Sequence, residues 1–195
     1  FDFVMKKLKA GKTSSPTGTP NEVLKAIATD PSFARNLLEF INFCWESQLE
    51  PTLWHESEVI ELYKGKGDPT RFDNYRPISL IDSIAKIYSR LKLYRLQSIT
   101  SHIIRRTQYG FQADASVDDV LFIIHRIIEA NVSSQMAPLL LVLLDWSKAF
   151  DSVHHDGILY ALKRLGIEGR MYDAIAKQLR SVHFRVRESN IQSDR

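Results

Sequence analysis

Apolar and polar positions alternate along most of this chain with the period of a helix or of a strand. From Phe33 to Trp45 the apolar side chains recur at helical spacing, and Asp30 followed by Pro31 is typical of an N-cap before a first turn. This pattern predicts an amphipathic helix over 30–47. Further helices are predicted over 21–28, 83–97, 116–128, 157–165 and 170–181.

Two extended segments flank a turn rich in Gly and Pro. Residues 58–64 and 74–80 carry strand-forming side chains, and 64–69 between them read Lys-Gly-Lys-Gly-Asp-Pro. We expect a hairpin with Lys64 and Lys66 near its tip and Arg76 on its return arm. A lysine on a glycine-rich turn can hold phosphate, although many such turns are solvated loops. A third strand is predicted over 182–187, where apolar and basic residues alternate.

The most informative stretch is an unbroken apolar run, Leu139–Leu144, that ends at Asp145. A run this short, entered from Pro138, favours a strand buried on both faces. Asp145 would then lie where the strand leaves the sheet, as a natural ligand for a hard cation such as Mg²⁺. The alternative is that Asp145 only caps a turn or short helix. For Asp118 and Asp119 we favour a capping role with Ser116 over a metal site, because an apolar helix follows.

Composition and charge narrow the class of protein. The 195 residues suit one domain or parts of two, and the net charge is +3. Residues 59–106 carry +6 and the rest −3, which suggests a polyanionic partner, although a solvated basic face is the simpler explanation. The single cysteine, Cys44, favours a reducing compartment, so we expect an intracellular protein, nuclear or cytoplasmic and not secreted. No apolar window is long enough to span a bilayer, and we expect no membrane partner.

The order of several short strings is more specific than any of them alone. They are Glu61–Asp68, Asn74–Leu80, Gln108–Phe111, Asp145–Val153 and Leu165–Ile167, with Pro51 and Trp54 ahead of them. In this order the chain resembles the reverse transcriptase domain of non-LTR (LINE-like) retrotransposons, which is related to group II intron reverse transcriptases. The resemblance covers nearly the whole chain.

The resemblance implies an α+β fold, the fingers and partial palm of a right-hand polymerase, with helices packed on a small, mostly antiparallel sheet. Residues 1–135 would form the fingers region with an N-terminal extension, and 136–195 the N-terminal part of the palm. The chain starts at Phe1 and ends at Arg195, before the family's Tyr-x-Asp-Asp motif. We therefore expect a fragment that lacks the C-terminal palm and the thumb.

The resemblance also implies the site. Asp145 would be the catalytic carboxylate and a metal ligand together with the backbone carbonyl of Trp146, in a centre of two Mg²⁺ ions, with Mn²⁺ as an alternative. Phe150 would lie under the sugar of the incoming nucleotide. Arg76, with Lys64 or Lys66, would grip its triphosphate.

The expected partners are an RNA template, a DNA primer and dNTPs. Gln108 and Phe111 belong to a loop that would lie near the template and the nucleotide pocket. The basic helix 83–97 and the strand residues Arg185 and Arg187 would face nucleic-acid backbone, or else form only an exposed face.

Two departures from the family pattern leave a second function open. The usual Gly-Pro-Asp-Gly loop reads Ser15-Pro16-Thr17-Gly18, and Gln112 replaces an arginine. The chain is thus interpreted as part of an RNA-directed DNA polymerase, alternatively as a non-catalytic nucleic-acid-binding remnant of a degenerate element. A nuclease or phosphatase using Asp145 is disfavoured, because no second carboxylate or His stands two residues away. With one carboxylate group only, we expect these 195 residues not to polymerise on their own.

Overall fold

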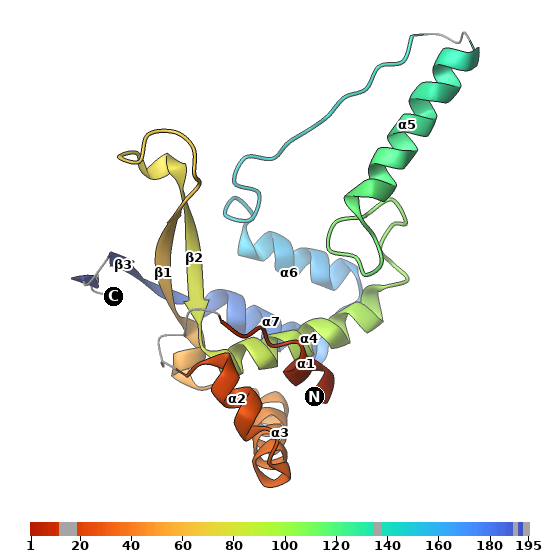
Figure 1. The fold of residues 1–195 in the computed structure, drawn as a ribbon. Helices are drawn as coiled ribbons and strands as arrows, with labels where there is room; N and C mark the ends of the chain where they lie inside the picture. The colour runs from red at the N-terminus through yellow and green to blue at the C-terminus, as the bar shows by residue number, and fades with distance from the viewer. Residues whose placement is uncertain (12–18, 135–137, 189–190, 193–195) are drawn as a thin grey trace. The chain divides into compact units, whose positions relative to one another are not determined.

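A computed structural model describes residues 1–11, 19–134, 138–188 and 191–192 of the chain, which divides into two compact units (Figure 1). Unit 1 comprises Phe1–Ser98 and His155–Arg195, and unit 2 comprises Ile99–His154. The altered loop Ser15–Gly18 lies outside the described residues. The expected division into fingers (1–135) and palm (136–195) stays a prediction.

Unit 1 begins with three helices, of which the second and third were predicted. They are α1 (Asp2–Lys6), α2 (Asn21–Ile27) and α3 (Pro31–Ser47). Asp30 caps α3 as predicted, because its carboxylate accepts hydrogen bonds from the backbone N–H groups of Ser32 and Phe33 at 2.8 and 2.9 Å. The short helix α1 was not predicted from the sequence.

Helix α4 (Ser83–Thr100) crosses this unit and joins its core. Asp82 caps it, with one carboxylate oxygen accepting from the N–H groups of Ile84 and Ala85 at 2.8 and 3.0 Å. The helix therefore begins at Ser83, as predicted, with Asp82 as its N-cap. The core shared by α1, α2, α3 and α4 consists of Val4, Met5, Leu8, Leu24, Leu37, Ile41, Cys44, Ile87 and Tyr88.

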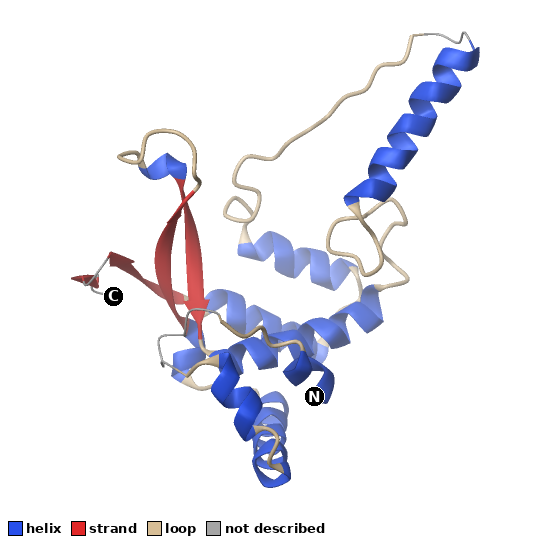
Figure 2. Cartoon of the chain, in the orientation of Figure 1, coloured by secondary structure: helices blue, strands red, loops and turns tan. Residues whose placement is uncertain are grey.

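The sheet also belongs to unit 1 and confirms the predicted hairpin. Strand β1 (Glu56–Tyr63) follows the short helix η1 (Thr52–His55), and η2 (Phe72–Asn74) leads into β2 (Tyr75–Ile81). β1 pairs antiparallel with β2, so that Leu62 lies opposite Arg76, and parallel with β3 (His183–Glu188), the third predicted strand. β4 (Ile191–Gln192) completes the order β2-β1-β3-β4. The fold is α+β, as expected, and two of its three strand pairings are antiparallel (Figure 2).

Two later helices form a second core of unit 1. They are α6 (His155–Arg164) and α7 (Gly169–Arg180). Gly166 follows α6 with a φ of +74°, the left-handed conformation that ends a helix and favours glycine. Leu159, Leu162, Ile167 and Met171 are buried between the two helices, and Trp45 of α3 packs against them.

Unit 2 contains α5 (Val117–Ser134) and long connecting loops. Asp119 accepts a hydrogen bond from the Ser116 N–H at 2.8 Å, and the Ser116 hydroxyl accepts from the Asp119 N–H at 3.3 Å, which confirms the predicted capping box. Neither α5 nor any other helix within the described residues combines the length and hydropathy needed to cross a membrane.

The predicted strand over Leu139–Leu144 is wrong for this structure. The segment runs without strand pairing, and its side chains are exposed, with Leu140 and Leu143 at 84% and 86%. A strand buried on both faces needs hydrogen-bonded neighbours. Among the described residues of its own unit, however, there is no strand with which it could pair.

One cation expected on the outer face of the basic helix is buried instead. Lys92 of α4 is only 5% exposed, and its ammonium donates a hydrogen bond to the Gln178 side chain of α7 at 2.7 Å. The same ammonium lies 3.7 Å from a carboxylate oxygen of Glu50. A buried Lys is tolerated when a carboxylate and a hydrogen-bond acceptor meet it, and a sequence pattern of period 3.6 does not reveal such a partner.

Candidate functional site

The predicted site residues fall into two groups, one in each unit. The tip of the β1–β2 hairpin in unit 1 carries Lys64, Lys66 and Arg76. Unit 2 carries Gln108 and Phe111 in one loop and Asp145–Phe150 in another.

The hairpin tip is a closely hydrogen-bonded loop rather than a loose turn. The Asn74 side-chain amide donates to the Asp68 carbonyl at 2.8 Å, and the Tyr75 hydroxyl donates to the Pro69 carbonyl at 2.9 Å. Gly67 has a φ of +82°, and a Cβ there would lie 2.6 Å from the Asn74 side-chain nitrogen. A glycine is therefore required at this position, both for its backbone and for the space it leaves.

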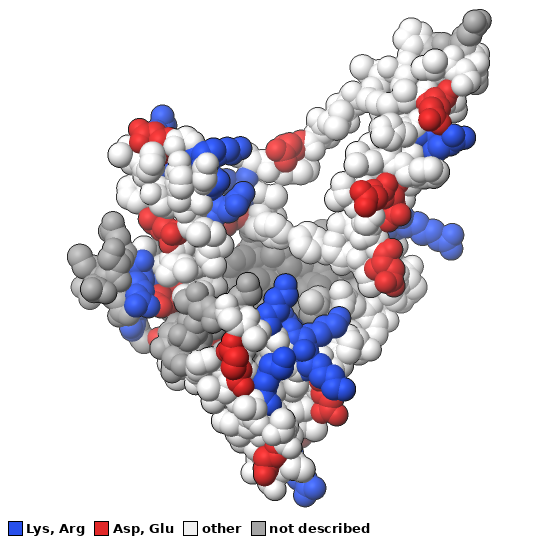
Figure 3. Space-filling view, viewed as in Figure 1, with Lys and Arg blue, Asp and Glu red and all other residues white. Residues whose placement is uncertain are grey.

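The three cations of this hairpin have different surroundings. Lys64 donates a hydrogen bond to the Asp73 carbonyl, and its backbone N–H donates to the Asn74 carbonyl at 2.8 Å. Its ammonium thus helps to close the loop. Lys66 and Arg76 are exposed, and the described residues supply neither with a hydrogen-bond or ion-pair partner. Lys and Arg side chains alternate with acids over this hairpin (Figure 3). Two of the three predicted cations remain available to an anionic ligand.

Asp145 and Trp146 lie in an exposed loop of unit 2. Trp146 is 80% exposed, and Asp145 is exposed as well. The turn that follows is closed by a hydrogen bond from the Ser152 N–H to the Lys148 carbonyl at 2.9 Å, and Lys148 has a φ of +50°. The Ser152 hydroxyl also donates to the Ser147 carbonyl at 3.4 Å.

Two residues predicted to contact the nucleotide meet in unit 2. The rings of Phe111 and Phe150 contact edge to face, with centroids 6.0 Å apart and planes at 84°. Both remain more than 80% exposed. The third predicted residue of this unit, Gln108, donates from its side-chain amide to the Gly110 carbonyl at 3.2 Å, so it stabilises the loop. The ring pair offers a surface on which a sugar or base could rest.

A metal centre needs several oxygen or nitrogen ligands that converge. Within the described residues, no group of three or more His, Cys, Asp or Glu side chains could hold an ion. Asp145 is exposed and belongs to no such group, so the described residues do not by themselves fit the two-ion centre that the family resemblance implies.

The interior of unit 1 holds a charged group that the sequence did not reveal. Glu50 lies between Lys92 and His55, with its two oxygens 3.7 Å from the Lys92 ammonium and 3.5 Å from His55 Nε2. Burial lowers the pKa of Lys92, and the charge of Glu50 opposes this shift. Burial also lowers the pKa of His55 and raises that of the nearby Tyr88 hydroxyl. This group joins α4 to the segment before η1.

The residue that sequence reasoning missed at the hairpin is Asn74. It was identified only as part of a string, whereas the structure makes it the side chain that fills the space left by Gly67 and ties the tip together. A signal was present, because Asn at a turn readily bonds to nearby backbone.

Comparison with known proteins gives a consistent result. The family model described as reverse transcriptase (RNA-dependent DNA polymerase) matches residues 64–193, which include the hairpin tip, Phe111, Asp145 and Phe150.

Individual relatives come from mobile elements. The chain is 34% identical over 138 residues to the RNA-directed DNA polymerase from mobile element jockey of Drosophila melanogaster, covering 66% of this chain and 14% of the relative. It is 29% identical over 193 residues to the probable RNA-directed DNA polymerase from transposon BS of the same species, covering 97% of this chain and 21% of the relative. A retrovirus-related Pol polyprotein from the type-1 retrotransposable element R2 of Popillia japonica is 31% identical over 121 residues, covering 60% of this chain and 16% of the relative. The chain thus matches between 14% and 21% of the length of these relatives.

Proposed function

Because this chain belongs to the reverse transcriptase (RNA-dependent DNA polymerase) family, we propose that it serves the RNA-directed synthesis of DNA by a retrotransposable element. Its ligands would be an RNA template, a DNA primer and dNTPs. The observation that carries the proposal is the family match over 64–193, which contains all the predicted site residues.

The hairpin tip supports a role in holding anions. Lys66 and Arg76 are exposed and lack partners among the described residues, whereas Lys64 is committed to the Asp73 carbonyl. Arg76 can hold a phosphate bidentately and Lys66 can act as a point charge. We assign the triphosphate contact to Arg76 and Lys66, and a structural role to Lys64.

In unit 2 the ring pair supports a role in placing the nucleotide. Phe150 would support the sugar, and Phe111, which meets its ring edge to face, would hold Phe150 in position. A substitution at Phe111 should then change sugar selection through Phe150.

For the metal we propose only that the complete enzyme depends on a divalent cation. The family resemblance implies Mg²⁺, and Asp145 with the Trp146 carbonyl is the candidate ligand pair. Since the described residues contain no group of three or more His, Cys, Asp or Glu side chains that could hold an ion, no chemical step is assigned to them. We propose that residues 1–195 hold ligands but do not extend a primer by themselves.

Photolabelling with an azido-dATP tests the nucleotide contact. In the presence of an RNA template annealed to a DNA primer, label should fall on peptides of the hairpin tip or of the loops that carry Phe111 and Phe150. Excess dATP should compete, and Arg76→Gln should reduce the labelling about tenfold. Label on other peptides, or label that dATP does not displace, would oppose the assignment.

Primer extension with Mg²⁺ and all four dNTPs tests the proposal that residues 1–195 do not synthesise DNA by themselves. The expected result is no product from the 195-residue chain. A product that Asp145→Asn abolishes would mean that these residues suffice for catalysis, and the proposed limit would be wrong.

A further inference from the structure

Residues of α1, of the segment after it and of α4 line a groove of about 350 Å³ in unit 1. It contains none of the residues assigned to the nucleotide or the metal, but its α4 side belongs to the basic helix expected to face nucleic-acid backbone. Its apolar lining includes Val4 and Leu93. Its charged and aromatic lining consists of Phe3, Lys7, Lys9, Arg90 and Tyr94, with the amide of Gln97 at one side. None of these lining residues is acidic. Lys and Arg side chains gather over this part of the surface (Figure 3).

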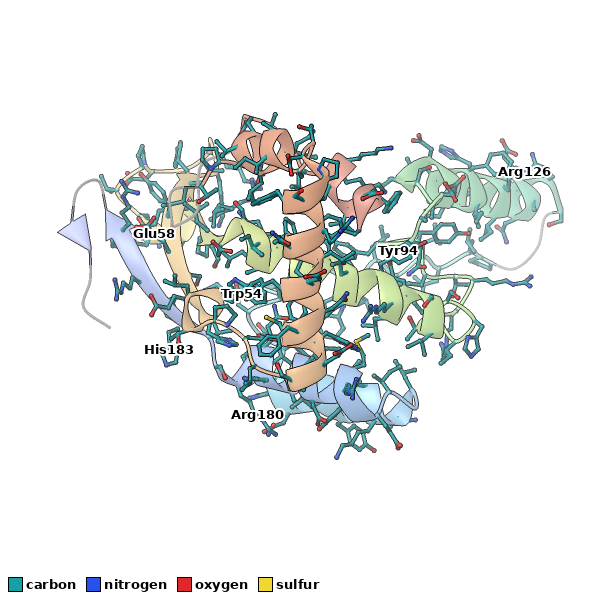
Figure 4. All side chains as sticks on the ribbon, turned by 90° about the horizontal axis from the view of Figure 1, so that it is seen from below. Trp54, Glu58, Tyr94, Arg126, Arg180 and His183 are labelled. Atoms are coloured by element: carbon teal, nitrogen blue, oxygen red, sulfur yellow. The ribbon has the colours of Figure 1, made fainter. Side chains whose placement is uncertain are left out.

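Two aromatic rings of the groove are exposed and in contact. The rings of Phe3 and Tyr94 lie 5.8 Å apart at 51°, and the two residues are 54% and 60% exposed. Figure 4 labels Tyr94 on α4. The Lys7 ammonium lies 4.2 Å from the centre of the Phe3 ring. An exposed ring pair beside a cation is the arrangement on which nucleic-acid bases stack while phosphates meet the charge.

The backbone that carries the two lysines is held in place. Three successive carbonyls after α1 each accept a hydrogen bond from a side chain of another helix. Arg90 donates to the Lys7 carbonyl at 3.0 Å, Lys25 to the Leu8 carbonyl at 3.3 Å, and Asn21 to the Lys9 carbonyl at 2.9 Å. This rim is fixed by α2 and α4, so Lys7 and Lys9 need little ordering when a ligand binds.

From these observations we infer that the α1–α4 groove binds single-stranded nucleic acid. Phe3 and Tyr94 stack a base, while Lys7, Lys9 and Arg90 hold the flanking phosphates. The groove shares no residue with the hairpin tip or with the loop of Asp145. The inference rests on the proposed function, in which RNA is a ligand, but the groove itself needs neither nucleotide nor metal. An acidic peptide would satisfy the charges but would leave the exposed ring pair without a stacking partner.

Fluorescence anisotropy with 12-nucleotide oligo(U) and oligo(dT), without metal or dNTPs, tests the inference. Tyr94→Leu keeps an apolar side chain but removes the ring, and it should weaken binding about fivefold or more. Lys7→Gln with Lys9→Gln should weaken binding further and lower the slope of log K against log salt by about 1.4, which corresponds to two lost phosphate contacts. If the substitutions weaken binding of both oligonucleotides equally, the groove recognises features that RNA and DNA share, namely phosphates and bases. If they weaken binding of oligo(U) alone, the groove is specific for RNA.

A matched control distinguishes the loss of groove contacts from the general effect of a lower net charge. Arg164→Gln with Arg170→Gln removes the same charge from exposed positions of α6 and the start of α7. The control should bind like the unaltered chain. Equal weakening by the control, or no effect of the groove variants, would overturn the inference, as would preferential binding of a poly-Glu peptide.

Crosslinking gives a result that does not depend on a variant folding. Oligo(U) containing 4-thiouridine should crosslink to the peptides that carry Phe3 and Tyr94, and Asp145→Asn should leave this crosslink unchanged. Crosslinks confined to the hairpin tip would contradict the groove while leaving the proposed function intact.

Discussion

The ammonium of Lys92 lies 3.7 Å from a carboxylate oxygen of Glu50 inside unit 1, and the two side chains are only 6% and 4% exposed. Lys92 also lies 4.4 Å from the centre of the Tyr88 ring and donates to Gln178 of α7. One buried cation therefore connects α4, α7 and the segment before η1. Each of the two charges, on Lys92 and on Glu50, is stable in the interior only because the other lies beside it.

Removing one partner of this pair should be costly. Lys92→Met leaves the Glu50 carboxylate buried beside an apolar side chain and should lower the free energy of unfolding by about 3–5 kcal/mol. The double variant Glu50→Gln with Lys92→Met should cost clearly less than the two single changes together, because neither charge is then left alone. Urea unfolding of the four proteins measures this coupling.

The exposed ion pair between Arg71 and Asp73 at the hairpin tip is the matched control. Its atoms lie 3.7 Å apart, but both side chains are at least 70% exposed. Arg71→Met should change the unfolding free energy by less than about 1 kcal/mol. Additive effects of the Glu50 and Lys92 changes would mean that the pair does not act as described.

The pKa of His55 should make stability depend on pH. Burial lowers this pKa below its ordinary value of 6.5, Lys177 and Lys92 add to the shift, and Glu50 opposes it. The unfolded chain then binds more protons than the folded chain at pH values between the two pKa values, so stability should fall as the pH drops through 6.5. Melting temperatures from pH 8 to pH 5 should flatten in His55→Gln relative to the unaltered chain. An identical pH profile for both proteins would exclude this role.

Substituting two glycines of the hairpin turn in separate variants distinguishes the cost of backbone strain from the cost of a steric clash. Gly65 and Gly67 both have positive φ, but a Cβ at Gly65 meets nothing within 4 Å, whereas at Gly67 it meets the Asn74 side chain. Gly65→Ala should cost about 1 kcal/mol for its backbone, and Gly67→Ala more. Hydrogen exchange of 64–75 should be faster in the second variant. Equal exchange in the two would mean that Asn74 moves aside at little cost.

The exposed apolar side chains of unit 2 predict self-association. Leu140, Leu143 and Leu144 are more than 80% exposed, and within α5 no residue is buried. Apolar surface of this kind tends to be covered by another chain or segment. Size-exclusion chromatography with light scattering should give a mass above 22.4 kDa that rises with concentration. Leu140→Lys with Leu143→Lys should shift the protein towards the monomer; a monomer for the unaltered chain at all concentrations would contradict this expectation.

Elements whose signals are local could be predicted from the sequence. Asp30 caps α3, Ser116 and Asp119 form their capping box, and Gly166 follows α6, because each depends on neighbours within four residues. The hairpin was predicted for the same reason. Leu139–Leu144 could not be assigned correctly, since a buried strand depends on distant partners. The burial of Lys92 depends on Glu50 and Gln178, which are 42 and 86 residues away in the sequence.

The candidate site was predictable in its residue types but not in its geometry. The pattern indicated Lys64, Lys66 and Arg76 together, and the structure commits Lys64 to the loop while it leaves the other two exposed. The contact between Phe111 and Phe150 joins two strings 39 residues apart, which no periodicity within either string could indicate.

Equilibrium binding of an RNA template annealed to a recessed DNA primer tests the central claim most directly. The account predicts that the chain binds this hybrid and then dATP, and that Lys66→Gln with Arg76→Gln weakens the binding of dATP about tenfold or more, whereas Arg164→Gln with Arg170→Gln leaves it unchanged. Failure to bind the hybrid, or equal weakening by the two pairs of substitutions, would contradict a role for this chain in RNA-directed DNA synthesis through its hairpin tip.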